Sequence, residues 1–309
     1  MKEYISKQSE SHQIRTRSFL ERDIYTWLGK REANTIKASE IIQVVKKVAD
    51  RGAIDAAKRT KGIIQQVFDY AVAHDKAERN PAKDVNLQLI LPKTVKKHYA
   101  AITEPAKLAE LLRAIENYQG STVVKAALRL IPMVMTRPSE LTNAEWEEID
   151  FDTSTWTIPA KRRKLLTHTK KANRPEDAHI VPLSNQVVEI LKDLYIYSSD
   201  GKYLFPSPRG RSRPISNNAI RTALRTMGFD NNTITAHGFR GVASTFLNTM
   251  GYRSEIIEAQ LAHKDKNAIR EAYNHADYID ERRVMLQEWA NYLDSLRAGA
   301  EVIPIKRAS

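Results

Sequence analysis

Two short segments of this 309-residue chain alternate apolar and polar residues as β-strands do, and they lie close together in the sequence. Trp156 and Ile158 alternate with threonines in STWTIPA (154–160), and HIVPLS (179–184) follows a similar pattern. Two such neighbours are expected to pair as an antiparallel hairpin. Strands this few and this local cannot build a βαβ arrangement, and helical periodicity prevails elsewhere. The sequence therefore predicts a mainly α-helical chain with a small antiparallel β-hairpin, of the α+β class.

The first ninety or so residues have a helical pattern throughout. Apolar residues recur at helical spacing around Trp27 and again in residues 41–48, where Ser39 is the expected N-cap. A third helix is expected over residues 53–73, with one apolar side and one basic side. The basic side carries Lys58, Arg59 and Lys61. We expect residues 1–92 to form a helical domain with one basic side.

A basic segment separates this domain from the rest of the chain. Residues 93–104 include Lys93, Lys96 and Lys97, which favours either a linker lying along DNA or a plain solvated loop. Residues 105–296 are then expected to form a second, mainly helical domain that contains the two predicted strands, followed by a tail over residues 297–309. Its later helices are expected over residues 185–197, 216–227, 235–250, 254–261 and 280–296.

The balance of charge points to a polyanionic partner. Lysine and arginine number 49 against 37 acidic residues, for a net charge of +12. Nucleic acid is the first candidate, because each neutralised phosphate releases counterions. A membrane is a weaker one, because no apolar run approaches the roughly 18 residues that a span requires. The absence of cysteine excludes disulfides, thiolate zinc sites and cysteine nucleophiles, and it suits a cytoplasmic protein.

One candidate anion-binding residue is Arg137, in MVMTRPSELTNAEW. Pro138 begins a helix there, so Arg137 stands at its start, at the edge of a core. A guanidinium offers a planar fork of donors to phosphate oxygens, and Glu140 is placed to orient that fork. The alternative is an Arg–Glu pair that only stabilises the helix start.

A second candidate lies in TAHGFRGVASTFL, where His237 and Arg240 share one helical face. Thr235 is the expected N-cap, and the positive end of the helix favours an anion beside both side chains. The alternative is a capped helix with a solvated arginine.

The segment between the two predicted strands is strongly basic. Residues 161–174 hold seven lysines and arginines and no acid, as expected of a long hairpin loop that lies against DNA. Lys164, just past the first strand, is placed to protonate a departing alkoxide, although Lys161, Lys170 and Lys171 lie close by in sequence. The alternative is one more solvated charge. The further expected DNA contacts are Lys161, Arg162, Arg163, Lys170, Lys171, Arg211 and Arg213.

The last candidates lie in LAHKDKNAIREAYNHADY, which contains His263 and, ten residues on, Tyr273. A phenol with an ordinary pKa near 10 needs a base and nearby positive charge to act as a nucleophile. The chain has twelve tyrosines, so Tyr273 is a candidate nucleophile only in combination with the other candidate residues. Two arginines, two histidines, a lysine and a tyrosine suffice for phosphoryl transfer, so we expect no metal or other cofactor. The sequence contains no Walker-type motif, so ATP-driven chemistry is not expected.

These residues, in this order, resemble the signature of the tyrosine recombinases of the phage integrase family, most closely the integrases of phages and genomic islands. TRPSEL, WTIPA, HIVPLS, HGFR, LAH and AYNHADY each match that pattern. VFDYAVAHDKAERNP extends the resemblance to the helical first part, so that it covers most of the chain.

The resemblance implies both a chemistry and an assembly. Tyr273 would attack a phosphodiester of double-stranded DNA, giving a 3′-phosphotyrosine and a free 5′-hydroxyl. Arg137 and Arg240 would clamp the phosphate, His237 and His263 would support them, and Lys164 would be the acid. A core-binding domain and a catalytic domain would clamp the DNA. Monomers would assemble into a tetramer on two sites, with accessory DNA-bending or excision factors, and the tail would pack on a neighbouring subunit.

Two departures and two alternatives accompany the resemblance. Relatives usually carry an amino-terminal arm-binding domain that this sequence lacks, and the core-binding domain is expected to be truncated at its start. The same residues also suit a type IB topoisomerase-like nicking and closing enzyme. A non-catalytic DNA-binding accessory protein is the third reading, distinguished by the absence of covalent attachment to nicked DNA.

Overall fold

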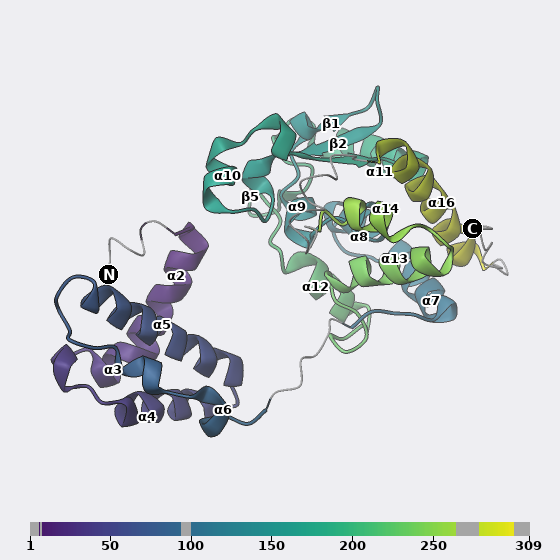
Figure 1. Cartoon of the computed structure of the whole chain (residues 1–309). Helices are drawn as coiled ribbons and strands as arrows, with labels where there is room; N and C mark the ends of the chain where they lie inside the picture. Colours follow the sequence, from purple (N-terminus) through teal and green to yellow (C-terminus); the bar gives the residue numbers. More distant parts are fainter. Residues whose placement is uncertain (1–5, 7, 94–99, 264–277, 300–309) are drawn as a thin grey trace. The chain divides into compact units, whose positions relative to one another are not determined.

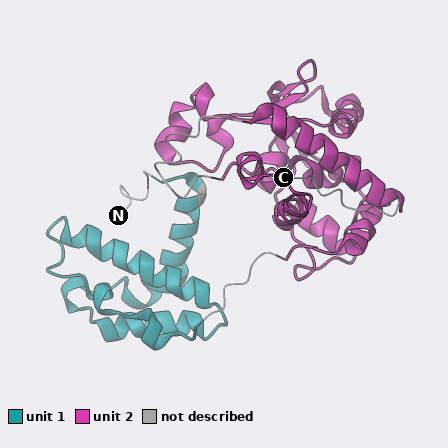
Figure 2. Ribbon diagram, turned by 45° about the vertical axis from the view of Figure 1, so that its right-hand side comes forward, with its two compact units in different colours: residues 1–97 teal, residues 98–309 magenta. Residues whose placement is uncertain are grey.

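The computed structural model describes residues 6, 8–93, 100–263 and 278–299. The chain divides into two compact units, residues 1–97 and 98–309 (Figure 2). Tyr273, Lys96, Lys97 and most of the predicted tail lie outside the described residues. None of the described helices combines the length and the apolar character that crossing a membrane requires.

Unit 1 is helical in its described part, with no strand there. Its helices and helical turns are α2 (Glu10–Phe19), the π-helical turn η1 (Leu20–Ile24), α3 (Tyr25–Leu28), η2 (Ala33–Thr35), α4 (Ala38–Ala49), α5 (Ile54–Val72), η3 (Pro81–Asp84) and α6 (Leu87–Ile90).

The core of unit 1 forms around the antiparallel pair α4 and α5. On α4, Ile41, Val45 and Val48 are buried at the spacing that places residues on one helical face. Ile64 and Phe68 on α5 are buried one turn apart in the same cluster. The apolar periodicity of the sequence therefore identifies the packed faces of this helix pair.

The predicted N-cap of α4 is wrong. The helix begins at Ala38 and its N-cap is Lys37, so Ser39 lies inside the first turn. The N-cap backbone N–H of Lys37 donates to the Glu40 side chain at 3.0 Å, which satisfies the helix start without a serine cap.

Unit 2 combines helices with two small antiparallel sheets, so the predicted α+β class is confirmed. Its helices are α7 (Pro105–Glu116), α8 (Thr122–Val134), α9 (Pro138–Thr142), η4 (Trp146–Glu148), η5 (Ala160–Arg162), α10 (Thr167–Ala172), η6 (Pro175–Asp177), α11 (Asn185–Ser198), α12 (Ala219–Thr226), α13 (Gly238–Thr249), α14 (Ser254–Gln260) and α16 (Ile279–Ala298). Its strands are β1 (Ile149–Asp150), β2 (Thr155–Ile158), β3 (His179–Pro182), β4 (Pro206–Ser207) and β5 (Gly210–Pro214).

Helix α8 lies at the centre of unit 2, packed by α7, α11, α12, α13 and α16 (Figure 1). Leu128 and Ile131 on α8 are fully buried, because helices surround it on several sides. The helix ends at Met135, which has a left-handed φ of 58°. The last carbonyl groups of α8 therefore lie inside the unit, where side chains from other elements have to donate hydrogen bonds to them.

The predicted hairpin forms between β2 and β3, which pair antiparallel with Trp156 opposite Val181 and Ile158 opposite His179. The short strand β1 adds to the other edge of β2, and β4 pairs with β5 in a second sheet. The connection between β2 and β3 differs from the predicted long hairpin loop. It contains α10, and the Asn173 side chain accepts a hydrogen bond from the Lys161 backbone at 2.9 Å, which ties the segment back to the end of β2.

Candidate functional site

Arg137 is held at the start of α9 by Glu140, as its spacing predicts. The Arg137 backbone N–H and its Nη1 donate to the two oxygens of the buried Glu140 carboxylate, each at 2.9 Å. Its Nη2 donates to the Ala262 carbonyl at 3.2 Å. The side chain is 19% exposed, so the guanidinium is oriented on one side and accessible on the other.

Arg240, on the first turn of α13, is buried against the end of α8. Its Nη1 donates to the Met135 carbonyl at 2.6 Å and its Nη2 to the Leu261 carbonyl at 2.7 Å. Burial, and then the charge of Arg137, lower the pKa of Arg240 from its ordinary value to about 10. The guanidinium therefore remains charged at neutral pH although it lies in a desolvated position.

The start of α13 differs from the prediction by two residues. His237 is the N-cap, whereas Thr235 lies before it and accepts a hydrogen bond from the Gly238 backbone at 3.0 Å. Gly238 has a steric role that the sequence did not reveal. A Cβ there would lie 2.2 Å from the Ala100 carbonyl oxygen, so this close approach requires glycine.

His237 lies among positive charges. Burial, and then the charges of Arg240 and Arg137, lower the pKa of His237 below 6.5, and His263 and Lys164 contribute in the same direction. The imidazole is therefore neutral at pH 7. A bound phosphate anion would reverse this effect, because an opposite charge nearby favours the protonated form.

His263 contacts Arg240 and a carboxylate that the sequence analysis missed. Its Nε2 lies 3.0 Å from Arg240 Nη2, and its Nδ1 lies 2.6 Å from Glu258 Oε2. A guanidinium can only donate, so Nε2 accepts a hydrogen bond from Arg240. Nδ1 then carries the ring proton and donates a hydrogen bond to Glu258. No sequence pattern singles out Glu258, which lies on α14 five residues before His263.

The lysine candidate stands on an anchored segment. Lys164 is exposed, and its charge acts on His237. The preceding Arg163 donates to the Asp177 carbonyl at 2.5 Å, so that the two ends of the β2–β3 connection are tied together. The structure therefore places Lys164 within electrostatic range of His237.

Arg162 does not fit the predicted role of a DNA contact. Its Nε donates to the Glu148 carboxylate at 2.6 Å, its Nη2 donates to the same group, and its Nη1 donates to the Glu140 carbonyl at 3.0 Å. The side chain is 10% exposed. The buried Glu148 carboxylate neutralises the charge of Arg162, so this ion pair stabilises the interior of unit 2. Trp156 also donates to Glu148, at 3.0 Å.

The other predicted DNA contacts within the described ranges are exposed or half-buried. Lys58 pairs with Asp55 at 3.6 Å, Lys61 donates to Gln65 at 2.5 Å, and Arg211 pairs with Asp200. The remaining described ones are Arg59, Lys93, Lys161, Arg163, Lys170, Lys171 and Arg213.

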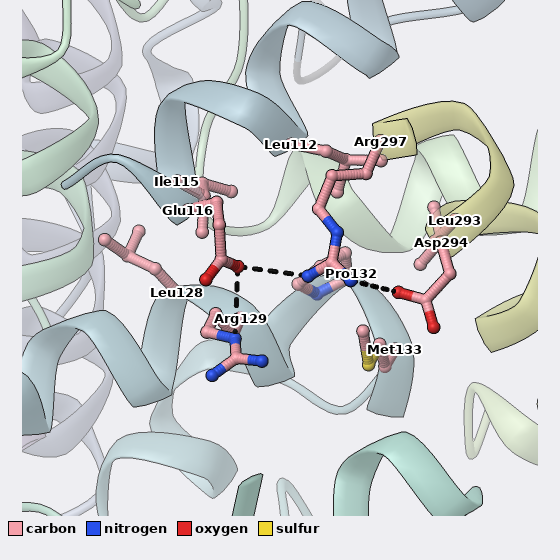
Figure 3. Close-up of a pocket in the computed structure, with 10 residues that line it drawn as sticks. All are labelled: Leu112, Ile115, Glu116, Leu128, Arg129, Pro132, Met133, Leu293, Asp294 and Arg297. Atoms are coloured by element: carbon pink, nitrogen blue, oxygen red, sulfur yellow. Dashed lines mark hydrogen bonds and ion pairs between the residues drawn. The ribbon is translucent and has the colours of Figure 1, made fainter. Parts of the chain in front are cut away.

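A small pocket elsewhere in unit 2 is unrelated to the cluster. It lies among α7, α8 and α16, where Glu116 pairs with Arg129 at 3.4 Å and with Arg297 at 3.0 Å (Figure 3). Its volume of about 20 Å³ suits a single water molecule rather than a nucleotide. Within the described ranges, no group of three or more histidines and acidic residues is placed to hold a metal ion.

Comparison with known proteins identifies both parts of the chain. Residues 1–88 match the phage integrase central domain, and residues 102–279 match the phage integrase family. The integrase of Enterobacteria phage P4 is 36% identical over 94% of this chain, and the chain spans 66% of that protein. The putative protein IntB of Escherichia coli strain K12 is 33% identical over 93% of this chain, which spans 73% of the relative.

Solved structures show the same fold at low sequence identity. A lambda integrase tetramer bound to a Holliday junction has a TM-score of 0.65 at 17% identity, covering 86% of this chain and 76% of that one. A lambda integrase dimer bound to a COC′ core site has a TM-score of 0.63 at 17% identity, covering 89% and 76%. With both parts matched, the chain belongs to the phage integrase family of tyrosine recombinases.

Proposed function

We propose that this chain is a site-specific DNA recombinase that cleaves and rejoins strands through a phosphotyrosine at Tyr273. One observation carries the proposal. Three separate stretches of sequence, which contain Arg137, His237 with Arg240, and His263, bring two guanidinium groups and two imidazoles together. A cluster of buried and half-buried cations is costly unless an anion binds it. The fitting anion is the backbone phosphate of DNA.

The two arginines are the phosphate clamp of this proposal. Arg137 is oriented by Glu140 and Ala262, and Arg240 by Met135 and Leu261. Fixed donors aimed at one place stabilise the charge that develops on phosphoryl oxygens in the transition state, and removing such a donor typically costs roughly 10²–10³ in rate. Neutral His237 would add a donor and take on positive charge as the phosphate gains negative charge.

The proposed reaction exchanges one phosphoester bond for another. The Tyr273 oxygen bonds to phosphorus as its proton leaves, and the bond from phosphorus to the 5′-oxygen breaks. Lys164 gives a proton to that 5′-oxygen. His263 is the base proposed to assist the phenol, for which its Nε2 would exchange the hydrogen bond from Arg240 for one from the Tyr273 hydroxyl. Attack by the 5′-hydroxyl of another strand then reverses the step and releases Tyr273, so bond energy is conserved.

Double-stranded DNA is the proposed partner, and the net charge of +12 supports it. Lambda integrase structures include a dimer on a COC′ core site and a tetramer on a Holliday junction. We extend this to the present chain as assembly of four copies on two DNA sites. Accessory DNA-bending or excision factors would assist, and the protein would act at the nucleoid.

The test is whether denatured protein stays attached to DNA. Purified protein is incubated with a pool of random-sequence duplexes, each nicked so that a short fragment is lost on cleavage and rejoining is prevented. We expect a detergent-resistant adduct from the unmodified protein and none from Tyr273→Phe, which keeps its DNA affinity because only a hydroxyl is lost. Tyr278→Phe, five residues on, is the matched control and should still form the adduct. Adduct formation by Tyr273→Phe would refute the assignment of the nucleophile.

Arg240→Ala separates catalysis from binding. It should reduce the rate of adduct formation by roughly 10³-fold or more and DNA affinity far less. Equal losses of rate and affinity would make Arg240 a simple phosphate contact. Joined strands from two different DNA molecules would indicate a recombinase, and relaxation of supercoils alone a topoisomerase-like enzyme. No adduct from any variant would leave a DNA-binding accessory protein.

A further inference from the structure

Three buried polar residues lie behind the cationic cluster and have no part in the proposed reaction. Gln260 at the end of α14 is 0% exposed, Arg282 near the start of α16 is 2% exposed, and His179 on β3 is 7% exposed. Buried polar groups of this kind are stable only when they are hydrogen-bonded, so each contact that they make constrains the fold.

Gln260 is the residue on which these contacts converge. Its Oε1 accepts from Arg282 Nε at 3.0 Å and from Arg282 Nη2 at 2.8 Å. Its Nε2 donates to the Val134 carbonyl at 2.9 Å, in the last turn of α8. Its backbone carbonyl lies 3.1 Å from His179 Nε2, which is the donor because a carbonyl can only accept. Both ends of the side chain and the backbone oxygen are therefore fixed.

Arg282 links helix α16 to Gln260 and to strand β3. Its Nη2 also donates to the Ile180 carbonyl on β3 at 2.5 Å. Gln260 is thus held between α8, β3 and α16, three elements that are distant in sequence. Since each is packed in the core of unit 2, Gln260 cannot move without moving a buried partner.

The two residues after Gln260 support the two arginines. Leu261 offers its carbonyl to Arg240 at 2.7 Å, and Ala262 offers its carbonyl to Arg137 at 3.2 Å. Ala262 also adopts a left-handed φ of 49°, which costs energy for a residue with a Cβ. Gln260 lies next to Leu261 and two residues before Ala262, so fixing Gln260 restrains this backbone turn.

We propose that Gln260 is a positioning residue of the recombinase, and that Arg282 and His179 act through it. Its function is to fix the carbonyls of Leu261 and Ala262, so that the guanidinium groups of Arg240 and Arg137 face one phosphate. This inference depends on the proposed function only for its catalytic consequence. These hydrogen bonds also stabilise the core, because an apolar side chain at position 260 would leave the buried Arg282 guanidinium and the Val134 carbonyl without this partner, so stability is measured beside activity.

The experiment uses Gln260→Leu, which keeps the size of the side chain and removes its donor and acceptor. Arg282→Lys keeps the charge, but a single ammonium cannot reproduce the fork that reaches both Gln260 and Ile180. The matched control is Arg283→Met, because Arg283 is the next residue on α16 and donates to the Ser154 carbonyl at 3.3 Å instead. Leu194→Ala in the α11 part of the core provides a variant destabilised at a distance from the site.

Two quantities are measured on folded protein: DNA affinity, and the rate of covalent adduct formation with DNA in the nicked random-sequence pool at saturating protein. We expect Gln260→Leu to lower the rate by roughly 100-fold, the effect of a misplacement of about 1 Å, with affinity within about threefold. Arg282→Lys should show a smaller loss of the same kind, while Arg283→Met and Leu194→Ala cleave at the unmodified rate. Cleavage by Gln260→Leu at that rate would overturn the proposal, as would a loss no greater than its unfolded fraction explains.

A second readout does not depend on activity. The NMR signal of the Arg240 guanidinium, assigned with Arg240→Lys, reports its order in the absence of DNA. We expect it to shift and broaden in Gln260→Leu and to stay unchanged in Arg283→Met. An unchanged signal in Gln260→Leu would contradict positioning. If no protein formed an adduct while this signal still responded, the proposed function would fail and the positioning role would stand. If Gln260→Leu did not fold, both readouts would be taken from Arg282→Lys, and an unchanged rate and signal there would overturn the proposal.

Discussion

His179 should make the stability of unit 2 depend on pH in a way that one substitution removes. Burial is the main cause that lowers the pKa of His179 well below 6.5, and the charges of Arg282, Arg163 and Arg137 act in the same direction. The hydrogen bond to the Gln260 carbonyl opposes the shift without cancelling it. His179 is therefore neutral in the folded protein at neutral pH.

The sign and size of the effect follow from proton linkage. As the pH falls through 6.5, the unfolded chain binds a proton at residue 179 and the folded chain does not, so the unfolded state is favoured. The stability is complete above about pH 7 and is lost as the pH falls from 6.5 towards the lowered pKa of the folded state. Between pH 7.5 and 5.5, one such histidine removes on the order of 1 kcal/mol from the free energy of unfolding.

The substitution His179→Gln keeps a donor for the Gln260 carbonyl but cannot titrate. We expect its free energy of unfolding to fall less than that of the unmodified protein over the same pH interval, by on the order of 1 kcal/mol. Urea unfolding is followed by tryptophan fluorescence in a Trp27→Phe background, because the other three of the four tryptophans lie in unit 2. His168→Gln, at an exposed position in α10, is the control for loss of a histidine. Parallel pH profiles for His179→Gln and the unmodified protein would refute the reasoning.

Three further substitutions test other parts of the site. Gly238→Ala should abolish DNA cleavage or lower the unfolding midpoint by several degrees, because its Cβ would meet a backbone carbonyl at 2.2 Å, whereas Gly241→Ala, with its nearest contact at 3.4 Å, should be tolerated. Urea unfolding should show that Arg162→Ala destabilises the protein by about 3 kcal/mol, because it leaves the buried carboxylate of Glu148 unpaired; a selective loss of DNA affinity would instead restore Arg162 as a DNA contact. Lys164→Ala should lose adduct formation on ordinary DNA and regain it when sulfur replaces the 5′-bridging oxygen, because a thiolate leaves without a proton; failure of the sulfur substrate would remove Lys164 as the acid.

The sequence predicts those parts of the fold that repeat a pattern over many residues. The helices α4 and α5 of unit 1 follow from apolar periodicity, whereas α2 is not predicted, and the pairing of β2 with β3 follows from the alternation around Trp156 and Ile158. The strands β1 and β4 have two residues each, too few to show an alternation. Helix starts are also poorly determined, because backbone groups can be satisfied by Glu40 or by a turn before His237 as well as by a predicted cap.

The site is only partly visible in the sequence, because residue types reveal chemistry but not burial. The family signature identifies Arg137 and Arg240 without indicating what holds them. Gln260 and Arg282 have no periodic or motif signal, since a buried polar residue appears in sequence as an ordinary polar one. Arg162 shows the converse: a basic run suggests an exposed charge, and only the arrival of a distant carboxylate reveals that the charge is paired.

The way Arg240 is held explains how a buried cation stays available to an anion. Among the described residues, the acceptors that it contacts are two backbone carbonyls and a neutral histidine, whereas Arg137 also has a carboxylate. Carbonyls satisfy the N–H donors but do not neutralise the charge, so burial disfavours the cation, as the pKa of about 10 records. A phosphate would supply the missing negative charge in the place where little water competes for it. In the proposed reaction, a carboxylate in place of either carbonyl would stabilise the free protein and weaken the clamp, so part of the stability of unit 2 would be exchanged for affinity towards the transition state.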